Sequence, residues 1–291
     1  MSTVMTRLKS SPLFRYVNIP RRFIYALGYY RERLSDLIVW LFKSKEYTNF
    51  TYDLTERNIA DLCDFLAVSL GGTFEEFQGY VAEIQNDTAL ADHVRELTRH
   101  SPFRTVSDED VKFGRRIGWY AAVRHLKPAV IVETGVEKGL GSLVLCAALL
   151  RNKAEGHPGH YYGTDIDPKA GWLFTGKYRD VGELLIGDSI ASLERLPVLI
   201  DLFINDSDHS AEYEAREYET IADKMASDGI IIGDNAHCTD KLSRFAHKTG
   251  LSYCFFREEP ARHWYPGGGI GLAFPKRSRG ARVSSKVVRL H

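Results

Sequence analysis

The chain has 291 residues, of which 44% are hydrophobic and 26% charged, and this balance is ordinary for a globular protein. Its length allows one large domain or two modest ones. The net charge is zero, which argues against nucleic acid as the main partner, because phosphate binding requires an excess of Lys and Arg.

The four cysteines are scattered, with no C-x-x-C pair. This usage suits a reducing cytosol and argues against a disulfide framework or a zinc knuckle. No apolar run approaches the roughly 18 residues needed to span a bilayer, and the start lacks a signal-peptide pattern. We therefore expect a cytoplasmic protein.

Residues 1–104 are predicted to form a helical region that supplies a lid, substrate contacts or the dimer contacts of a homo-oligomer. Between Phe23 and Phe42, apolar side chains recur every three or four residues, beside arginines on the other face. We favour a helix packed on the protein's own body. The alternative is a basic amphipathic helix that makes peripheral membrane contact, because residues 1–50 and the tail 276–291 each carry about six surplus positive charges.

Helix starts are predicted at "DLTE" (53–56), "TFEE" (73–76) and "SDED" (107–110), and the last of these helices should run to about His125. From residue 105 to residue 275, apolar runs alternate with helical segments. The runs are "AVIVE", "YYGTD", "ELLIGD", "DLFIND" and "GIIIGD", with "SYCFF" and "GIGLAF" as final strands. This alternation predicts an α/β fold with a doubly wound, mostly parallel sheet covered by helices on both faces.

Ligands of such sheets bind beyond the carboxyl ends of the strands. After the first strand, "VETGVEKGLGS" (132–142) provides a glycine-rich turn before a helix. Its spacing, G-x-x-x-G-x-G, is not that of a dinucleotide-binding turn, and no P-loop is present. Asp165 ends the second strand, where an acid accepts ribose hydroxyls, with Asp167 as the alternative. Asp188 ends the third strand and is a candidate acceptor for an adenine amino group.

With these motifs, residues 105–275 resemble the class I S-adenosylmethionine-dependent methyltransferases, which have a Rossmann-like fold. The resemblance implies that S-adenosylmethionine is the cofactor. It places Glu133, Gly135, Gly139 and Ser142 near the methionyl part, Asp165 at the ribose and Asp188 at the adenine.

Asp206 ends the fourth strand, and Asp234 and Asn235 end the fifth. Neighbouring parallel strands bring these oxygen ligands together, and such a set suits Mg²⁺. The pattern resembles the metal-dependent O-methyltransferases of the catechol and caffeoyl-coenzyme A type and the related sugar O-methyltransferases. The catalytic lysine of the catechol type is replaced here by His209, which is able to serve as a general base.

His237, close to the Asp-Asn pair, is a second catalytic candidate. The loop 257–269, with His263, Trp264 and Tyr265, either covers a substrate or packs on the surface.

The resulting hypothesis is an O-methyltransferase that depends on S-adenosylmethionine and Mg²⁺. Its acceptor is expected to be a hydroxyl of a sugar or natural-product small molecule. One alternative is a metal-dependent hydroxylase of the same fold, because the motif "DSDHS" is also similar to relatives of the cephalosporin hydroxylase. The other alternative is a cofactor-binding scaffold without catalysis.

Overall fold

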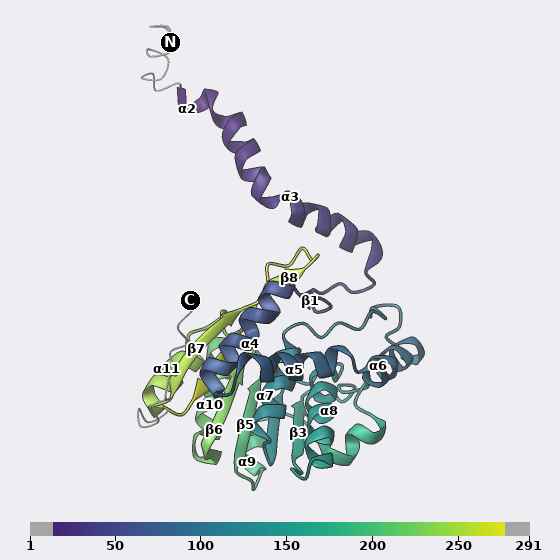
Figure 1. The fold of residues 1–291 in the computed structure, drawn as a ribbon, viewed down its shortest axis with the longest axis vertical. Coiled ribbons are helices and arrows are strands. Elements are labelled where there is room, and N and C mark those ends of the chain that lie inside the picture. Colours follow the sequence, from purple (N-terminus) through teal and green to yellow (C-terminus); the bar gives the residue numbers. More distant parts are fainter. Residues whose placement is uncertain (1–13, 277–291) are drawn as a thin grey trace, which may run out of the picture.

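A seven-stranded sheet forms the centre of the protein in the computed structural model, which describes residues 14–276 (Figure 1). The strand order is β4-β3-β2-β5-β6-β9-β7. Five strands are parallel: β2 (Val130–Thr134), β3 (His160–Asp165), β4 (Gly182–Ile186), β5 (Ile200–Asn205) and β6 (Met225–Gly233). Strand β9 (Gly269–Phe274) is antiparallel to both β6 and β7 (Ser252–Arg257). The predicted mostly parallel, doubly wound sheet is confirmed.

Helices cover both faces of the sheet because successive side chains of its inner strands point into different cores. Ile131 belongs to the larger core and Val132 to the smaller one, and Leu202 and Phe203 divide in the same way. The larger core includes helices α4 (Glu56–Leu70), α5 (Phe74–Gln85), α7 (Arg116–Leu126) and α8 (Leu140–Ala154). The smaller core includes α9 (Ser189–Arg195), α10 (Ala211–Ile221) and α11 (Lys241–Thr249). Burial on both faces explains why these strands read as continuous apolar runs.

The predicted boundary near residue 104 is not a break in the core. Leu62 of α4 and Phe77 of α5 are fully buried in the same cluster as Trp119 of α7. The short strand β1 (Asp53–Leu54) pairs with β8 (Pro260–Ala261), more than two hundred residues later. Helix α6 (Thr88–His100) also packs on α8. Residues 52–100 are thus built into the same body as the sheet.

Two of the three predicted helix starts are close to the observed ones. The Thr73 side chain accepts a hydrogen bond from the Glu76 N–H, as the capping motif predicts. The preceding helix is capped by Thr55, two residues after the start of its motif.

The third predicted start, at residues 107–110, was wrong, because helix α7 begins only at Arg116. The acids of that motif bind elsewhere: Asp108 accepts from the Ser44 hydroxyl at 2.6 Å, and Glu109 pairs with Lys45 and Arg99.

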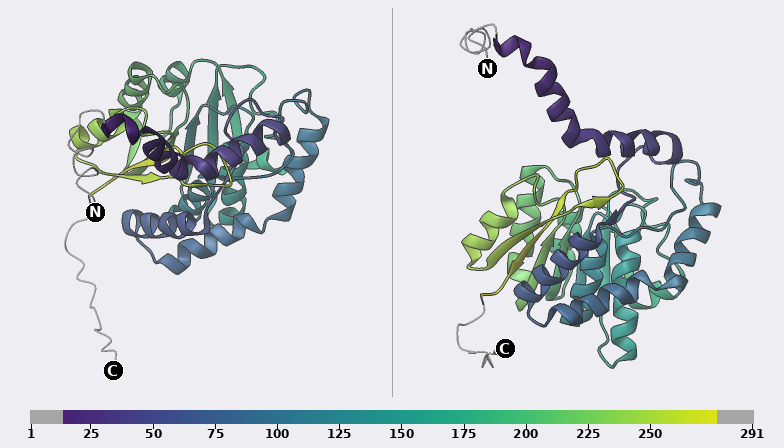
Figure 2. Two further views of the ribbon diagram at one scale, coloured as in Figure 1. Left: turned by 90° about the horizontal axis from the view of Figure 1, so that it is seen from above. Right: turned by 45° about the horizontal axis from the view of Figure 1, so that its top comes forward.

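The predicted N-terminal helix is present as α3 (Ile19–Lys43), after the short helix α2 (Phe14–Val17). It does not pack on the body as favoured from the sequence, because none of its described side chains is buried. Figure 2 shows this helix, called the N-terminal arm below, projecting away from the sheet and its helices. No helix in the described part of the chain is long and apolar enough to cross a membrane. The tail 277–291 lies outside the described residues, so the predicted basic tail is not described beyond Lys276.

Two short 3₁₀ helices, η1 (Gly176–Val181) and η2 (Ala222–Lys224), complete the described elements.

Candidate active site

A cavity of about 750 Å³ lies at the carboxyl ends of the parallel strands. It straddles β2 and β5, where the chain reverses its direction of travel across the sheet, which is the usual ligand site of this architecture. Its volume falls in the range of small-molecule sites. Six of the predicted site residues line it: Gly135, Asp165, Asp188, Asp206, His209 and Asn235. The structure therefore brings the predicted cofactor and chemical residues to one cavity.

The glycine-rich turn approaches the neighbouring strand closely. Gly135 has a φ of 82°, and a Cβ at this position would lie 2.0 Å from the Asp206 carbonyl oxygen. Only glycine fits such a conformation and such a contact. Gly139 also has a positive φ, and it packs against the backbone of Gly171 without lining the cavity.

Glu133 and Ser142, predicted to contact the cofactor, are instead buried behind the glycine turn. The Tyr161 hydroxyl donates to the Glu133 carboxylate, and the Ser142 hydroxyl lies 3.2 Å from the same oxygen. Burial raises the pKa of Glu133 to about 7, against the opposing effect of the Tyr161 hydrogen bond. Neither side chain lines the cavity. They support the turn from the interior.

Asp165 holds the glycine turn as well as facing the cavity. Its Oδ2 accepts hydrogen bonds from the N–H groups of Val136 (3.0 Å) and Glu137 (2.8 Å), and its Oδ1 accepts from Asp167 N. The carboxylate thus positions the turn and leaves lone pairs directed at the cavity. Asp167, the alternative ribose acid, is exposed and also lines the cavity.

Asp188 is fixed at the start of α9. It accepts from Ala191 N at 2.9 Å and from the Tyr213 hydroxyl at 2.8 Å, and these bonds lower its pKa. A carboxylate with a lowered pKa remains an acceptor at neutral pH, as binding an adenine amino group requires.

An aromatic wall of the cavity was not predicted. Phe103 and Trp172 both line it, and their rings stack with centroids 5.7 Å apart. A second contribution comes from the N-terminal side: Glu46 pairs with Lys138 of the glycine turn at 3.1 Å, and both side chains are largely buried. The segment just after the N-terminal arm therefore closes one side of the cavity.

Two of the predicted metal ligands and the predicted base converge at the other end. Asp206, His209 and Asp234 each offer a ligand atom within 4.8 Å of the other two. The Asn235 amide nitrogen lies 3.1 Å from His209 Nε2, and Asn235 has a positive φ of 49°. Asp206 and Asp234 share a hydrogen bond. Burial, and then the charge of Asp234, raise the pKa of Asp206 well above its usual range. The negative charge on Asp234 therefore opposes ionisation of Asp206.

Arg115 is the main feature of this end that the sequence did not predict. Its buried guanidinium donates to both oxygens of Asp234, lies 3.7 Å from Glu258 and donates to the Tyr52 hydroxyl at 3.1 Å. Tyr52 in turn donates to Glu258 at 2.5 Å. Burial raises the pKa of Asp234, but the charge of Arg115 together with the hydrogen bonds to Asp206 and Arg115 outweighs burial, and the net pKa is lowered.

The donor set fits a divalent cation. The carboxylates of Asp206 and Asp234 and the amide oxygen of Asn235 suit Mg²⁺ or a similar ion, and a cation between the two carboxylates would offset their mutual repulsion. Arg115 does not block this arrangement, because each Asp234 oxygen has a second lone pair. Arg116, 3.7 Å from Asp206, adds positive charge nearby, so the cluster is less acidic than its carboxylates alone suggest.

The other predicted residues lie outside the cavity lining. His237 is exposed, and partial desolvation lowers its pKa. In the loop 257–269, the rings of His263 and Tyr265 contact the ring of Tyr52. The ring centroid of Trp264 lies 5.3 Å from that of Trp40 in the N-terminal arm. Of the two interpretations of this loop, the described contacts favour packing over covering a substrate.

The residues missed were Arg115, Glu258 and Tyr52 around Asp234, and Tyr213, Trp172 and Lys138 around the cofactor end. Only one signal pointed to them: the arginine pair in "FGRRIG" (113–118) interrupts an otherwise apolar helix start. The partner of Arg115 lies 119 residues away, and no local pattern identifies it.

Three solved structures are similar to part of this chain. A methyltransferase from Podospora anserina with bound SAH is 18% identical, over 65% of this chain and 88% of that chain, with a TM-score of 0.47. The O-methyltransferase TomG from Streptomyces achromogenes, in complex with SAM, is 14% identical. The match covers 66% of this chain and 91% of that chain, with a TM-score of 0.49. An O-methyltransferase from Bacillus cereus with SAH is 13% identical. The match covers 76% of this chain and 99% of that chain, with a TM-score of 0.44.

A search of curated proteins finds no match to the chain. The family model described as "Methyltransferase domain" matches residues 132–236, from the strand before the glycine turn to just beyond Asn235. This match covers the strands and turns that line the cavity, and it confirms the predicted resemblance. Residues 132–236 are therefore similar to the methyltransferase-domain family, and this similarity supports an enzyme activity of that class.

Proposed function

We propose that the protein transfers a methyl group from S-adenosylmethionine to a hydroxyl of a sugar or natural-product small molecule. One observation carries the proposal: a single cavity is lined by Asp165 and Asp188 at one end and by Asp206, His209 and Asn235 at the other. A cofactor held at the first end therefore places its methyl group towards the second.

The cofactor end supplies binding and orientation. Asp165 is proposed to accept the ribose hydroxyls and Asp188 the adenine amino group, while Trp172 and Phe103 form an aromatic wall. Gly135 allows the methionyl part to approach the turn backbone. The buried Glu133 network keeps that turn in place from behind. Fixing the cofactor and acceptor in line lowers the entropic part of the barrier.

At the chemical end, the acceptor hydroxyl loses its proton as the methyl group moves from sulfur to oxygen. His209 Nε2 is proposed to take that proton, and the sulfonium leaves as a neutral thioether. Asp206, Asp234 and Asn235 would hold a divalent cation. When bound, such a cation lowers the pKa of an acceptor hydroxyl. Arg115 holds Asp234 in place through both of its oxygens.

The test combines cofactor calorimetry with methyl transfer to a panel of sugars and catechols, with Mg²⁺ or with a chelator. His209→Ala is expected to keep cofactor affinity and lose about 10²- to 10⁴-fold in turnover, the usual contribution of a general base. His247→Ala, an exposed histidine of α11, is the matched control and should retain full activity. Asp206→Asn is expected to lose both activity and its dependence on Mg²⁺.

Each part of the proposal can fail separately. Absence of cofactor binding overturns the methyltransferase reaction itself. Normal turnover by His209→Ala would show that another residue is the base. Activity that chelators do not change would show that the reaction needs no cation.

A further inference from the structure

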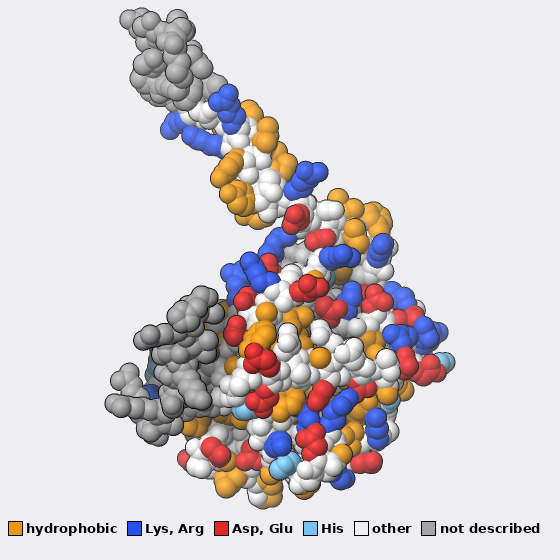
Figure 3. Space-filling model, viewed as in Figure 1, with side chains coloured by type: hydrophobic (Ala, Val, Ile, Leu, Met, Phe, Trp, Pro, Cys, Tyr) orange, Lys and Arg blue, Asp and Glu red, His pale blue; other side chains and the backbone are white. Residues whose placement is uncertain are grey.

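The N-terminal arm exposes an apolar stripe along its whole length. Phe23, Leu27, Tyr30, Leu34 and Leu41 are three, four or seven residues apart and share one face of the helix. Their exposed fractions are large, with 65% for Phe23, 60% for Tyr30 and 58% for Leu41. Figure 3 shows the hydrophobic side chains gathered along the arm with Lys and Arg beside them. An uncovered stripe of this extent is unusual for a surface that meets only water.

The same segment is strongly basic. Residues 1–43 carry two acids, Glu32 and Asp36, against eight basic side chains: Arg7, Lys9, Arg15, Arg21, Arg22, Arg31, Arg33 and Lys43. The whole chain is neutral, so the remainder carries the compensating negative charge. The arm therefore combines an apolar face with a positive field.

A second copy of the chain is a poor occupant for this face. Most exposed large hydrophobic side chains of the described residues lie in the arm, and the others, such as Val68, Ile166 and Leu199, are scattered over the body. The body thus offers no apolar groove of matching length. Pairing two arms face to face would bring two basic segments together, which like-charge repulsion opposes.

An anionic lipid surface satisfies both features. We propose that the N-terminal arm docks the enzyme on membranes that contain anionic lipids, with its apolar stripe in the interface and its arginines at the headgroups. Helices with this pairing of an apolar face and basic flanks lie in the interfacial plane, and each basic side chain near an anionic surface raises the affinity about fivefold.

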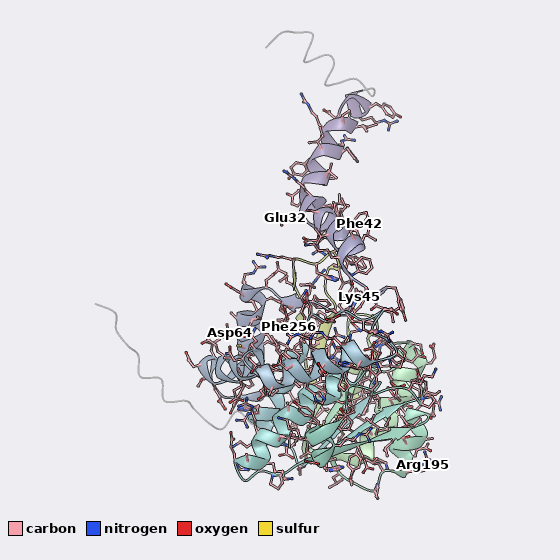
Figure 4. The ribbon with its side chains drawn as sticks, turned by 90° about the vertical axis from the view of Figure 1, so that its right-hand side faces the viewer. Glu32, Phe42, Lys45, Asp64, Arg195 and Phe256 are labelled. Atoms are coloured by element: carbon pink, nitrogen blue, oxygen red, sulfur yellow. The ribbon has the colours of Figure 1, made fainter. Side chains whose placement is uncertain are left out.

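The base of the arm is fixed to the body, so docking would orient the cavity. Trp40 packs on Trp264, Ser44 donates to Asp108 at 2.6 Å, and Lys45 N donates to the same carboxylate at 2.7 Å. Figure 4 places Glu32 and Phe42 on the arm and Lys45 where the arm meets the body. Four of the next residues line the cavity: Glu46, Tyr47, Thr48 and Phe50. The cavity edge therefore lies beside the base of the arm.

The test measures co-sedimentation of the full chain with vesicles, so it does not depend on the proposed reaction. One vesicle is phosphatidylcholine alone, and the other contains about 30% phosphatidylglycerol as anionic lipid. The matched variants are Tyr30→Glu and Tyr29→Glu. Both replace an exposed tyrosine of the arm, 60% and 72% exposed respectively, with the same charge change. Tyr30 lies on the apolar stripe, whereas Tyr29 lies off it and bonds to Tyr25.

The wild-type chain is expected to bind the anionic vesicles and to dissociate as salt is raised to about 0.5 M, because screening weakens surface attraction. Tyr29→Glu should lower the partition coefficient about fivefold, because only the surface charge term is altered. Tyr30→Glu should lower it about fiftyfold or more, since the same charge is added and an aromatic contact is lost as well.

Three results would overturn the proposal. They are no binding to the anionic vesicles at low salt, equal binding by the two variants, or a lipid-free dimer in sedimentation velocity that Tyr30→Glu dissociates. The last result would identify the second copy as the occupant.

Discussion

Replacing Glu133 by glutamine is expected to change how stability depends on pH. Burial raises the pKa of this carboxyl from an ordinary 4.5 to about 7. The folded state therefore holds the proton more tightly than the unfolded state between these two values. An acid with a raised pKa stabilises the fold fully below pH 4.5 and loses this contribution as the pH rises through about 7.

The magnitude follows from the shift. At about 1.4 kcal/mol per unit of pKa, the titration of Glu133 should remove roughly 2.5 kcal/mol of the free energy of unfolding between about pH 5 and about pH 8. Glu133→Gln cannot titrate, so the wild-type chain should lose that much stability relative to the variant over this range. The hydrogen bonds to Tyr161 and Ser142 can persist, because the amide oxygen still accepts.

The assay is urea unfolding of both proteins at the two pH values, with Glu75→Gln, an exposed glutamate of α5, as the matched control. The control should follow the wild-type chain at both pH values. Parallel pH profiles for the wild-type chain and Glu133→Gln would refute the reasoning and place the carboxyl in a solvated environment.

Two further changes test the site. Arg115→Met leaves the buried Asp234 carboxylate unpaired and should cost about 3–5 kcal/mol in urea unfolding. Arg57→Met, at an exposed ion pair, is the matched control and should leave stability nearly unchanged. Similar losses for the two variants would contradict a buried role for Arg115. Asp165→Ala should weaken S-adenosylmethionine binding by about 1.5–3 kcal/mol in calorimetry, and Asp167→Ala should leave it nearly unchanged. The reverse ranking would assign the ribose to Asp167.

Much of the fold was predictable from the sequence because it depends on local patterns. Apolar runs such as "AVIVE" and "DLFIND" predict buried parallel strands, and a polar residue at the end of each run predicts the edge where ligands bind. Gly135, Asp165 and Asp206 were placed correctly at that edge for this reason. Capping of helix α5 by Thr73 was likewise predictable from the sequence, because the hydrogen bond spans only three residues.

Only the tertiary structure decided which of these side chains face the cavity. Glu133 lies one residue from the glycine turn, but alternation along β2 directs it into the larger core, where Tyr161 and Ser142 surround it. The sequence of a strand shows that successive side chains point to opposite faces of the sheet. Because both faces are buried here, both carry apolar side chains, and the sequence does not show which face a given residue occupies.

The electrostatic partners and the free surface of the arm also depended on the tertiary structure. Arg115 meets Asp234 and Glu258 across 119 and 143 residues of chain, and no sequence spacing specifies such a pair. The periodicity of α3 correctly predicted an amphipathic helix, but its apolar face does not meet the body. Periodicity fixes which side chains share a face, whereas the position of the helix relative to the core decides what that face can contact.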